Sequence, residues 1–291
     1  MDWAASILQI IIYGIARGCV YVILALGLNL IMGTMKIINL SHGVIFILAA
    51  YMVYSMSVAF PFVDPYVLMF LALLLFFVLG AGLYLGLFAR VKTRAGSTVA
   101  SFGLLKVLEV VILIIWTANP KIIPSTYSMT IFSFGFFSMA ISRVILIFTT
   151  LLTAFLSGIL LMKTIFGKAV RAISEDATAA SLMGINVSKI NCLSFSLGIV
   201  LCCLAGATYG INYSFDPYGG LMFTLKGIVS ITIGGLGSML GAVVGGCILG
   251  IVENAVAYQI GAGWQDVAAY LAFLLILLFK PRGIFGRKGE L

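Results

Sequence analysis

The feature that most constrains this chain is a series of long apolar runs that recur from its first residues to its last. A helix needs about 20 consecutive apolar residues to cross a bilayer, and these runs are long enough. Only 9% of the residues are charged, whereas a soluble domain carries about a quarter. Because backbone polar groups inside a bilayer must be satisfied within the segment itself, such runs form helices. The sequence therefore predicts an all-α polytopic membrane protein.

The basic residues are clustered beside the ends of the apolar runs. The chain holds 17 Lys and Arg against 9 Asp and Glu, a formal charge of +8. The main clusters are Lys36; Arg90, Lys92 and Arg94; Lys163, Lys168, Arg171 and Lys189; and Lys280, Arg282, Arg287 and Lys288. Basic residues at the ends of spans are typical of cytoplasmic loops. The charge therefore indicates topology, and we expect no nucleic acid partner.

The apolar runs and their basic flanks predict a definite path through the membrane. We expect full spans over 6–33, 41–59, 66–89, 98–117, 142–162, 190–211 and 264–279. With the basic clusters in the cytoplasm, the N-terminus before Ser6 and the loop 117–142 face the periplasm. The loops 89–97 and 163–189 and the C-terminus then face the cytoplasm.

The remaining apolar segment, 219–261, must begin and end on the outer side to keep this order of spans. It forms either two short crossings or one re-entrant loop. The expected turning point is GlyGlyLeuGlySer at 234–238, because glycine lets the backbone bend. Counting one full span within this segment, we expect about eight transmembrane helices in all, plus one segment that forms a possible re-entrant half-helix. No long polar stretch interrupts the chain, so residues 1–291 are expected to form a single transmembrane domain.

One polar, alanine-rich segment within the loop 163–189 departs from the apolar pattern. Asp176 is a good N-cap, strong helix formers follow it, and Gly184 stands where a helix ends in a left-handed residue. This helix is expected outside the bilayer, where it offers small and apolar residues: Ala177, Ala179, Ala180, Ser181, Leu182 and Met183. Two interpretations follow. Either a second protein docks on this helix, or the helix rests on lipid as an amphipathic segment.

Motifs along nearly the whole chain add a family resemblance. They are AlaLeuGlyLeuAsnLeuIleMetGly (25–33), IleAsnLeuSerHisGly (38–43), the polar segment GlyLysAlaValArgAlaIleSerGluAspAlaThrAlaAlaSerLeuMetGlyIleAsn (167–186), GlyGlyLeuGlySerMetLeuGlyAlaValValGlyGly (234–246) and LysProArgGlyIlePheGly (280–286). Together they resemble LivH-type permeases of the branched-chain amino acid ABC importer family. The chain departs from the family pattern at Thr178, where the cytoplasmic loop motif has Glu, at Val44 and at Arg17.

The resemblance implies a division of labour in the bacterial inner membrane. This chain would form half of an all-helical pore, and a second related permease subunit would form the other half. Two cytoplasmic ATPase subunits would supply energy, and a periplasmic or lipid-anchored binding protein would deliver substrate. ATP belongs to the ATPases, since this chain has no GxxxxGK[ST] phosphate loop. We expect no cofactor, no metal and no enzymatic activity in the chain itself.

The resemblance also implies roles for particular residues. Contacts with the ATPase are expected from Arg171, Glu175, Asp176, Ala179, Ala180 and Gly184. The expected translocation pathway comprises Asn39, His42, Gly43, Lys226, Gly234, Gly235, Gly237 and Glu253. His42, the single histidine, is predicted near the cytoplasmic face, where it either bonds a backbone carbonyl or serves the pathway. It is not a metal site, because ligation needs partner residues.

Charged residues within the spans need partners, since each costs at least about 2.5–3.5 kcal/mol at mid-membrane. Lys106 and Glu109, three residues apart, are expected to form an internal ion pair on one helix surface. Arg17 and Glu253 have no partner nearby in the sequence, so we expect folding or water to supply one. Lys226 either meets a substrate carboxylate or a helix end, or it snorkels or pairs between helices.

Two functions compete for this chain. The first is a permease subunit of an ABC importer for branched-chain or related amino acids. The second is a stand-alone secondary transporter or channel for a small polar solute, with Glu109, Glu253 and His42 as a proton relay. The docking helix favours the first function, because a self-sufficient carrier does not need one. An intramembrane enzyme is disfavoured by the single histidine and the scattered carboxylates.

Overall fold

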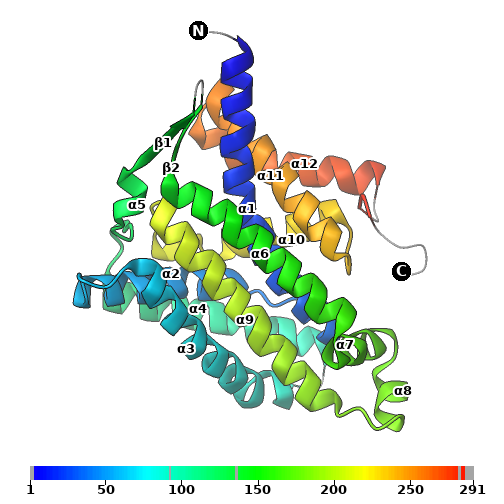
Figure 1. Cartoon of the computed structure of the whole chain (residues 1–291). Coiled ribbons are helices and arrows are strands. Elements are labelled where there is room, and N and C mark those ends of the chain that lie inside the picture. Colours follow the sequence, from blue (N-terminus) through cyan, green and yellow to red (C-terminus); the bar gives the residue numbers. More distant parts are fainter. Residues whose placement is uncertain (1–2, 92, 135–136, 281–282, 286–291) are drawn as a thin grey trace.

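Long helices dominate the computed structural model, which describes residues 3–91, 93–134, 137–280 and 283–285 (Figure 1). The helices are α1 (Trp3–Met35), α2 (His42–Ala59), α3 (Pro65–Gly86), α4 (Arg94–Trp116), α5 (Thr126–Met129), α6 (Ile141–Lys163), α7 (Ile165–Glu175), α8 (Ala177–Leu182), α9 (Val187–Asn212), α10 (Gly220–Gly234), α11 (Met239–Gln259) and α12 (Gln265–Phe279). Among the described residues, 8 helical stretches are long and apolar enough to cross a membrane. The predicted all-α polytopic membrane fold is confirmed.

Capping residues in the sequence set where the helices start. Asp64 accepts a hydrogen bond from Tyr66 N at 2.9 Å and precedes Pro65, the first residue of α3. Thr93 accepts one from Gly96 N at 3.1 Å at the start of α4. Both oxygens satisfy N–H groups that the first turn of a helix leaves without an intrahelical partner. The helices accordingly begin and end within a few residues of the predicted spans.

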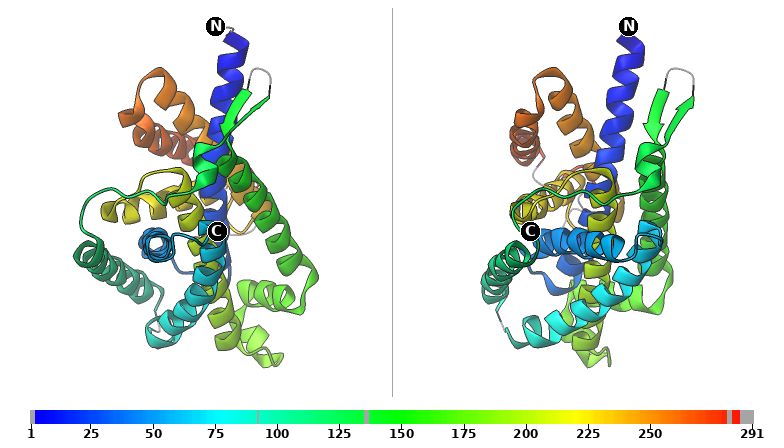
Figure 2. Two further views of the ribbon diagram at one scale, coloured as in Figure 1. Left: turned by 60° about the vertical axis from the view of Figure 1, so that its left-hand side comes forward. Right: turned by 90° about the vertical axis from the view of Figure 1, so that its left-hand side faces the viewer.

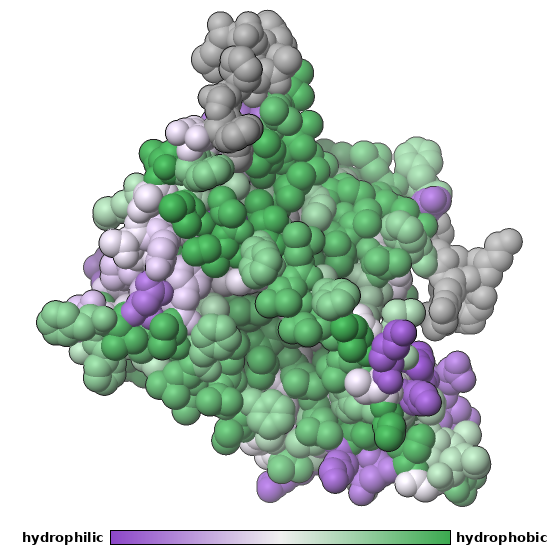
Figure 3. Space-filling view, in the orientation of Figure 1, coloured by the Kyte–Doolittle hydropathy of each residue, from purple (hydrophilic) through white to green (hydrophobic). Residues whose placement is uncertain are grey.

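The polar segments lie at two ends of the long helices α6 and α9. α5 and an antiparallel hairpin, β1 (Ile131–Phe134) and β2 (Phe137–Ala140), lie at one end, and α7 and α8 lie at the other (Figure 1). The surface over α6 and α9 is apolar, whereas polar residues gather over α7 and α8 (Figure 3). The hairpin, which the sequence did not predict, stands beside the N-terminal end of α1 (Figure 2), where Tyr13 Oη donates to Ser138 O at 2.8 Å.

Helix α2 forms much of the core. Its side chains from His42 to Ile47 are buried, and it packs against α3, α4, α9 and α10. The close approach of α9 depends on Gly206, where a Cβ would overlap the carbonyl oxygen of Phe46. Phe46 also packs its ring on Phe223 of α10, with 4.5 Å between centroids. Small residues of this kind let membrane helices approach closely.

The segment 219–261 forms two helices joined by a turn, α10 and α11, and of these only α11 is among the described stretches that are long and apolar enough to cross a membrane. α10 has 15 residues and α11 has 21, or about 22 Å and 31 Å at 1.5 Å per residue. The turn between them comes at the predicted glycines, with φ of 109° at Gly235 and 78° at Gly237. Near this turn, Ile284 N donates to Ile233 O at 2.9 Å and Phe285 N donates to Gly234 O at 2.8 Å. The turn and the end of α12 therefore lie on the same side of the bundle, as the predicted order of spans requires.

Replacing Gly206 with leucine should destabilise the protein, because the new side chain meets the backbone of α2. Overpacking of this kind costs about 1–3 kcal/mol. Gly158→Leu on α6 is the matched control, since nothing lies within 4 Å of its Cβ position. Thermal unfolding of the detergent-solubilised protein should show a lower Tm for Gly206→Leu only. Equal melting of the two variants would contradict the packing of α9 on α2.

Candidate functional site

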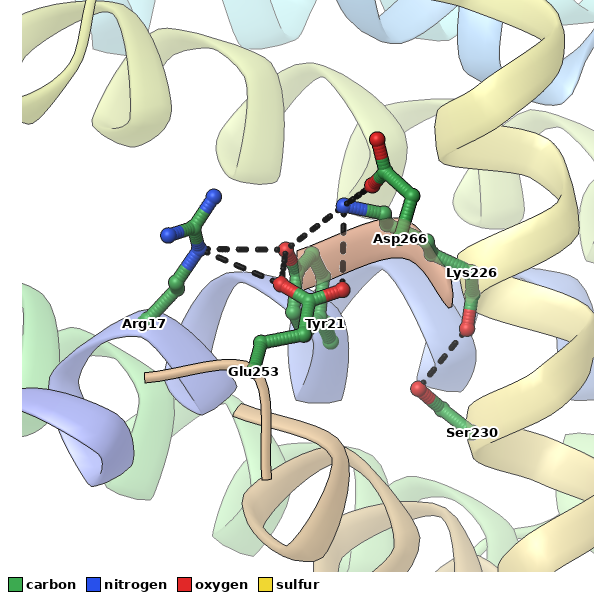
Figure 4. A network of polar contacts seen from close by, with 6 residues as sticks. All are labelled: Arg17, Tyr21, Lys226, Ser230, Glu253 and Asp266. Atoms are coloured by element: carbon green, nitrogen blue, oxygen red, sulfur yellow. Dashed lines mark hydrogen bonds and ion pairs between the residues drawn. The ribbon is translucent and has the colours of Figure 1, made fainter. Parts of the chain in front are cut away.

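A cluster of charged side chains joins four helices inside the bundle (Figure 4). We call it the charge cluster, and it consists of Arg17 and Tyr21 of α1, Lys226 of α10, Glu253 of α11 and Asp266 of α12. Three members are well buried: Tyr21, Lys226 and Glu253. The side chain of Asp266 is 38% exposed, so the cluster reaches the surface of the subunit at this residue.

The carboxylate of Glu253 is the centre of the charge cluster. Its Oε2 accepts a hydrogen bond from Tyr21 Oη at 2.5 Å and lies 3.2 Å from Arg17 Nε. Its Oε1 lies 3.0 Å from Lys226 Nζ, an ion pair whose angle is not that of a hydrogen bond. Lys226 Nζ also lies 2.8 Å from Asp266 Oδ1. The two cations and two carboxylates balance in charge.

This arrangement answers the expectation that Arg17 and Glu253 find partners through folding, because they pair with each other. Lys226 pairs between helices, one of the alternatives that the sequence left open. Asp266 was not singled out in the sequence, since an acidic residue in the first turn of a helix is common and stabilising there. Only two features of the sequence marked Asp266 as a partner for a buried cation, namely its negative charge and its place at the start of a span.

His42 and Asn39 lie in the interior of the protein. His42 Nε2 packs against Gly27, where a Cβ would lie 3.2 Å away. Gly27 precedes Met35, the last residue of α1, by eight residues, or about 12 Å along the helix. His42 is therefore fully buried and lies away from the end of α1, and its place relative to the cytoplasmic face stays a prediction. The segment before α2 folds back into the protein, and Leu40 N donates to Ser101 Oγ of α4 at 3.0 Å.

The start of α2 meets the start of α10. Gly43 N donates to Thr224 Oγ1 at 2.8 Å, and Thr224 Oγ1 donates to Leu40 O at 2.9 Å. Neither ring nitrogen of His42 has a hydrogen-bond partner among the described residues, and the same holds for Asn39 Nδ2. The ring lies beside the backbone carbonyl of Leu24 on α1, so its expected bond to a backbone carbonyl stays a prediction. Asn39 Oδ1 instead accepts from Ser41 Oγ at 2.6 Å.

The glycines predicted at the turning point do not leave an open backbone. Gly234 and Gly235 are buried, and a Cβ on Gly234 would overlap the backbone of Gly241. The carbonyl oxygen of Gly234 is occupied by Phe285 N. Gly237 is exposed, and its N–H donates to Asn29 Oδ1 at 3.2 Å. Gly234 therefore serves close helix packing.

The short helix predicted after Asp176, called the docking helix for its expected role, is present as α8 and is preceded by the longer amphipathic helix α7. The role itself stays a prediction. Asp176 Oδ1 accepts from Thr178 N at 2.7 Å and from Ala179 N at 3.1 Å, and these bonds hold the pKa of Asp176 below its usual value. Gly184 has φ of 85°, and Ile185 N donates to Ala180 O at 3.1 Å, so α8 ends in the predicted left-handed turn.

The outward face of the docking helix differs from the predicted one. Ala180 is only 5% exposed and faces the body of the protein, so its expected contact with a partner is wrong. The sequence could not show this, because an alanine fits either face of a short helix. Leu182 and Met183 are 83% and 84% exposed. Ala179, Gly184, Arg171, Glu175 and Asp176 are exposed as well.

A polar cavity of about 480 Å³ lies behind the docking helix. Its walls come from the ends of α1, α3 and α7 and the starts of α4, α8 and α9. Lys36 and Arg94 supply positive charge to the wall, and Glu175 and Asp176 supply negative charge. The cavity therefore lies between the docking helix and the ends of the membrane helices.

The predicted pair of Lys106 and Glu109 is formed, with 2.8 Å between Nζ and Oε2. The Lys106 side chain is 53% exposed on this subunit, whereas that of Glu109 is 17% exposed. Among the described residues no group of three or more His, Cys, Asp or Glu could hold a metal ion.

Comparison with known proteins gives matches over nearly the whole chain. Residues 10–279 match the family described as "Branched-chain amino acid transport system / permease component". The chain is 28% identical to the high-affinity branched-chain amino acid transport system permease protein BraD of Pseudomonas aeruginosa, over 96% of each chain. It is 27% identical to the corresponding permease LivH of Escherichia coli K12, also over 96% of each. No solved structure matches the chain.

A partial match points to a different kind of import system. The autoinducer 2 import system permease protein LsrC of Escherichia coli is 31% identical over 46% of this chain and 41% of LsrC. The relatives named here are all transport permeases. Like them, this chain is a multi-pass membrane protein with apolar spans throughout.

Removing the charge of Glu253 should destabilise the folded protein far more than removing the charge of Asp266. Glu253→Gln leaves Arg17 and Lys226 short of a buried counter-charge, and breaking a buried pair costs about 3–5 kcal/mol. Asp266→Asn removes a partly exposed partner, and exposed pairs are worth about 0–1 kcal/mol. Thermal unfolding in detergent measures both variants. A larger loss of stability in Asp266→Asn would refute the central place of Glu253.

Proposed function

Because the chain belongs to the family of branched-chain amino acid transport system permease components, we propose that it is a permease subunit of an ABC importer. It forms half of a translocation pathway for branched-chain or related amino acids. The full-length similarity to BraD and LivH carries this proposal. The comparisons support this function and give no support to the stand-alone carrier or channel.

The energy for transport comes from partners in this proposal. Two ATPase subunits bind ATP and dock on the α7–α8 segment, where Leu182 and Met183 project outward. The small exposed residue Ala179 lets the ATPase approach closely, and Asp176 and Gly184 fix the shape of the helix. Arg171 supports the segment from within, since its Nη1 donates to Leu161 O at the end of α6. The chain itself needs no cofactor.

The other partners lie in and above the membrane. A second related permease subunit completes the pathway, and a periplasmic or lipid-anchored binding protein delivers the amino acid. The pathway residues proposed in this chain are Asn39, His42, Gly43, Lys226, Gly237 and Glu253. The buried imidazole of His42 and the charge of Lys226 support that choice, because polar groups within a membrane mark solute pathways.

The test of this function is uptake by the complete complex in proteoliposomes. Leucine should accumulate only with ATP, the binding protein and both permease subunits present. Leu182→Asp with Met183→Asp should lower leucine uptake and ATPase co-purification together, because charged side chains replace the exposed apolar contacts. Ser188→Asp, an exposed change in the same loop, should leave both unchanged. Uptake by the isolated chain, driven by a proton gradient, would contradict the proposal.

The proposed orientation puts the N-terminus in the periplasm and the C-terminus in the cytoplasm of a bacterial inner membrane. Basic residues around α7 and α8 support it. Cysteines introduced at the exposed positions Thr130 and Ser188 should react with impermeant reagents added from opposite sides of the membrane. Thr130→Cys should label from the periplasmic side and Ser188→Cys from the cytoplasmic side. Labelling of both from one side would overturn this topology.

A further inference from the structure

We propose that the outward face of α4, which carries Lys106 and Glu109, is the contact surface for the second permease subunit. This inference rests on the proposed function, which requires two such subunits. It goes further by assigning the surface on this chain where they meet.

The pair lies at the middle of α4. Lys106 is twelve residues after Arg94 and ten before Trp116, the two ends of the helix. The helix is about 34 Å long at 1.5 Å per residue, so the pair stands near the centre of a bilayer core of about 30 Å. Figure 2 shows α4 at the edge of the bundle in both views. The Lys106 side chain, which is 53% exposed, therefore points away from the rest of this subunit.

A lipid environment fits this position poorly. Charged residues within membrane helices face a protein interior or a water-filled cavity, because lipid cannot satisfy them. The intrahelical contact with Glu109 uses one direction of the Lys106 ammonium, which has three donors. The other donors need polar partners at mid-membrane depth. The single subunit therefore leaves part of the hydrogen-bonding capacity of the Lys106 ammonium without a partner from α4.

The residues around Lys106 also differ from those of a lipid-facing helix. Gly103 and Val110 share its face, together with the larger Phe102, and nothing lies within 4 Å of the Cβ position of Gly103. The open space at Gly103 lets another helix approach closely. The exposed face of α6, by contrast, presents large side chains: Phe148, Leu151, Leu152, Phe155 and Leu156.

Only a membrane-embedded protein can meet Lys106 at this depth. The ATPases and the binding protein lie outside the bilayer in the proposed complex, which leaves the second permease subunit. Around a two-fold axis along the membrane normal, the two equivalent helices run in the same direction. Lys106 and Glu109 then offer a hydrogen-bond donor and an acceptor to polar side chains of the facing helix at the same depth.

Site-specific photocrosslinking in membranes that hold the complete complex tests this surface. A benzophenone amino acid in place of Val110 should yield an adduct with a permease subunit, identified by mass. The same amino acid in place of Leu152 on α6 is the matched control and should label lipid only. Lipid adducts alone at Val110, or adducts with the binding protein or an ATPase, would overturn the proposal.

A charge-reversed variant separates contact between subunits from the contact within the helix. Lys106→Glu with Glu109→Lys keeps an ion pair within α4 but reverses its direction. It should reduce recovery of an unmodified second subunit by about tenfold or more, because groups that faced a cation then face an anion, and the reverse. Unchanged recovery would mean that the pair serves α4 alone, and would refute the proposal.

The outcomes also separate this inference from the proposed function. Leucine uptake by the complex with no permease adduct at Val110 would refute the surface and leave the function standing. A permease adduct at Val110 in a complex that takes up no amino acid would support the surface and refute the proposed substrate.

Discussion

The buried carboxylate of Glu253 is the interaction on which the arrangement of the helices depends. It is fully buried and in contact with Arg17, Tyr21 and Lys226. A carboxylate in such a place is tolerable only with close, well-oriented counter-charges, so α1, α10 and α11 must pack tightly around it. Glycine makes this approach possible, since a Cβ on Gly250 of α11 would overlap the backbone of α1.

Helix α1 connects the two functional regions of the molecule. Its middle carries Arg17 and Tyr21 of the charge cluster, and its end at Met35 lines the cavity behind the docking helix. α2 then starts deep in the protein and bonds to α10, the helix that carries Lys226. A movement of the docking helix would therefore be transmitted to α1 and α10, which carry residues of the charge cluster. These contacts join the α7–α8 segment and the buried charge cluster through α1, α2 and α10.

The sequence predicted the features that local patterns determine. Apolar runs marked the spans, Asp176 and Gly184 marked the ends of α8, and glycines marked the turn between α10 and α11. It could not predict that Asp266 joins Lys226, because that pairing depends on how two helices forty residues apart pack. Nor could it predict that His42 packs against Gly27 of α1, which depends on how the segment before α2 folds back into the protein.

A double-mutant cycle between Lys226 and Glu253 tests the central claim most directly. Lys226→Met and Glu253→Gln are measured singly and together by the free energy of unfolding in detergent. If the two side chains form a buried pair, the double variant should be less destabilised than the sum of the single variants, with a coupling energy of about 0.5–3 kcal/mol. Additive losses, with no coupling, would contradict a bundle organised around the carboxylate of Glu253.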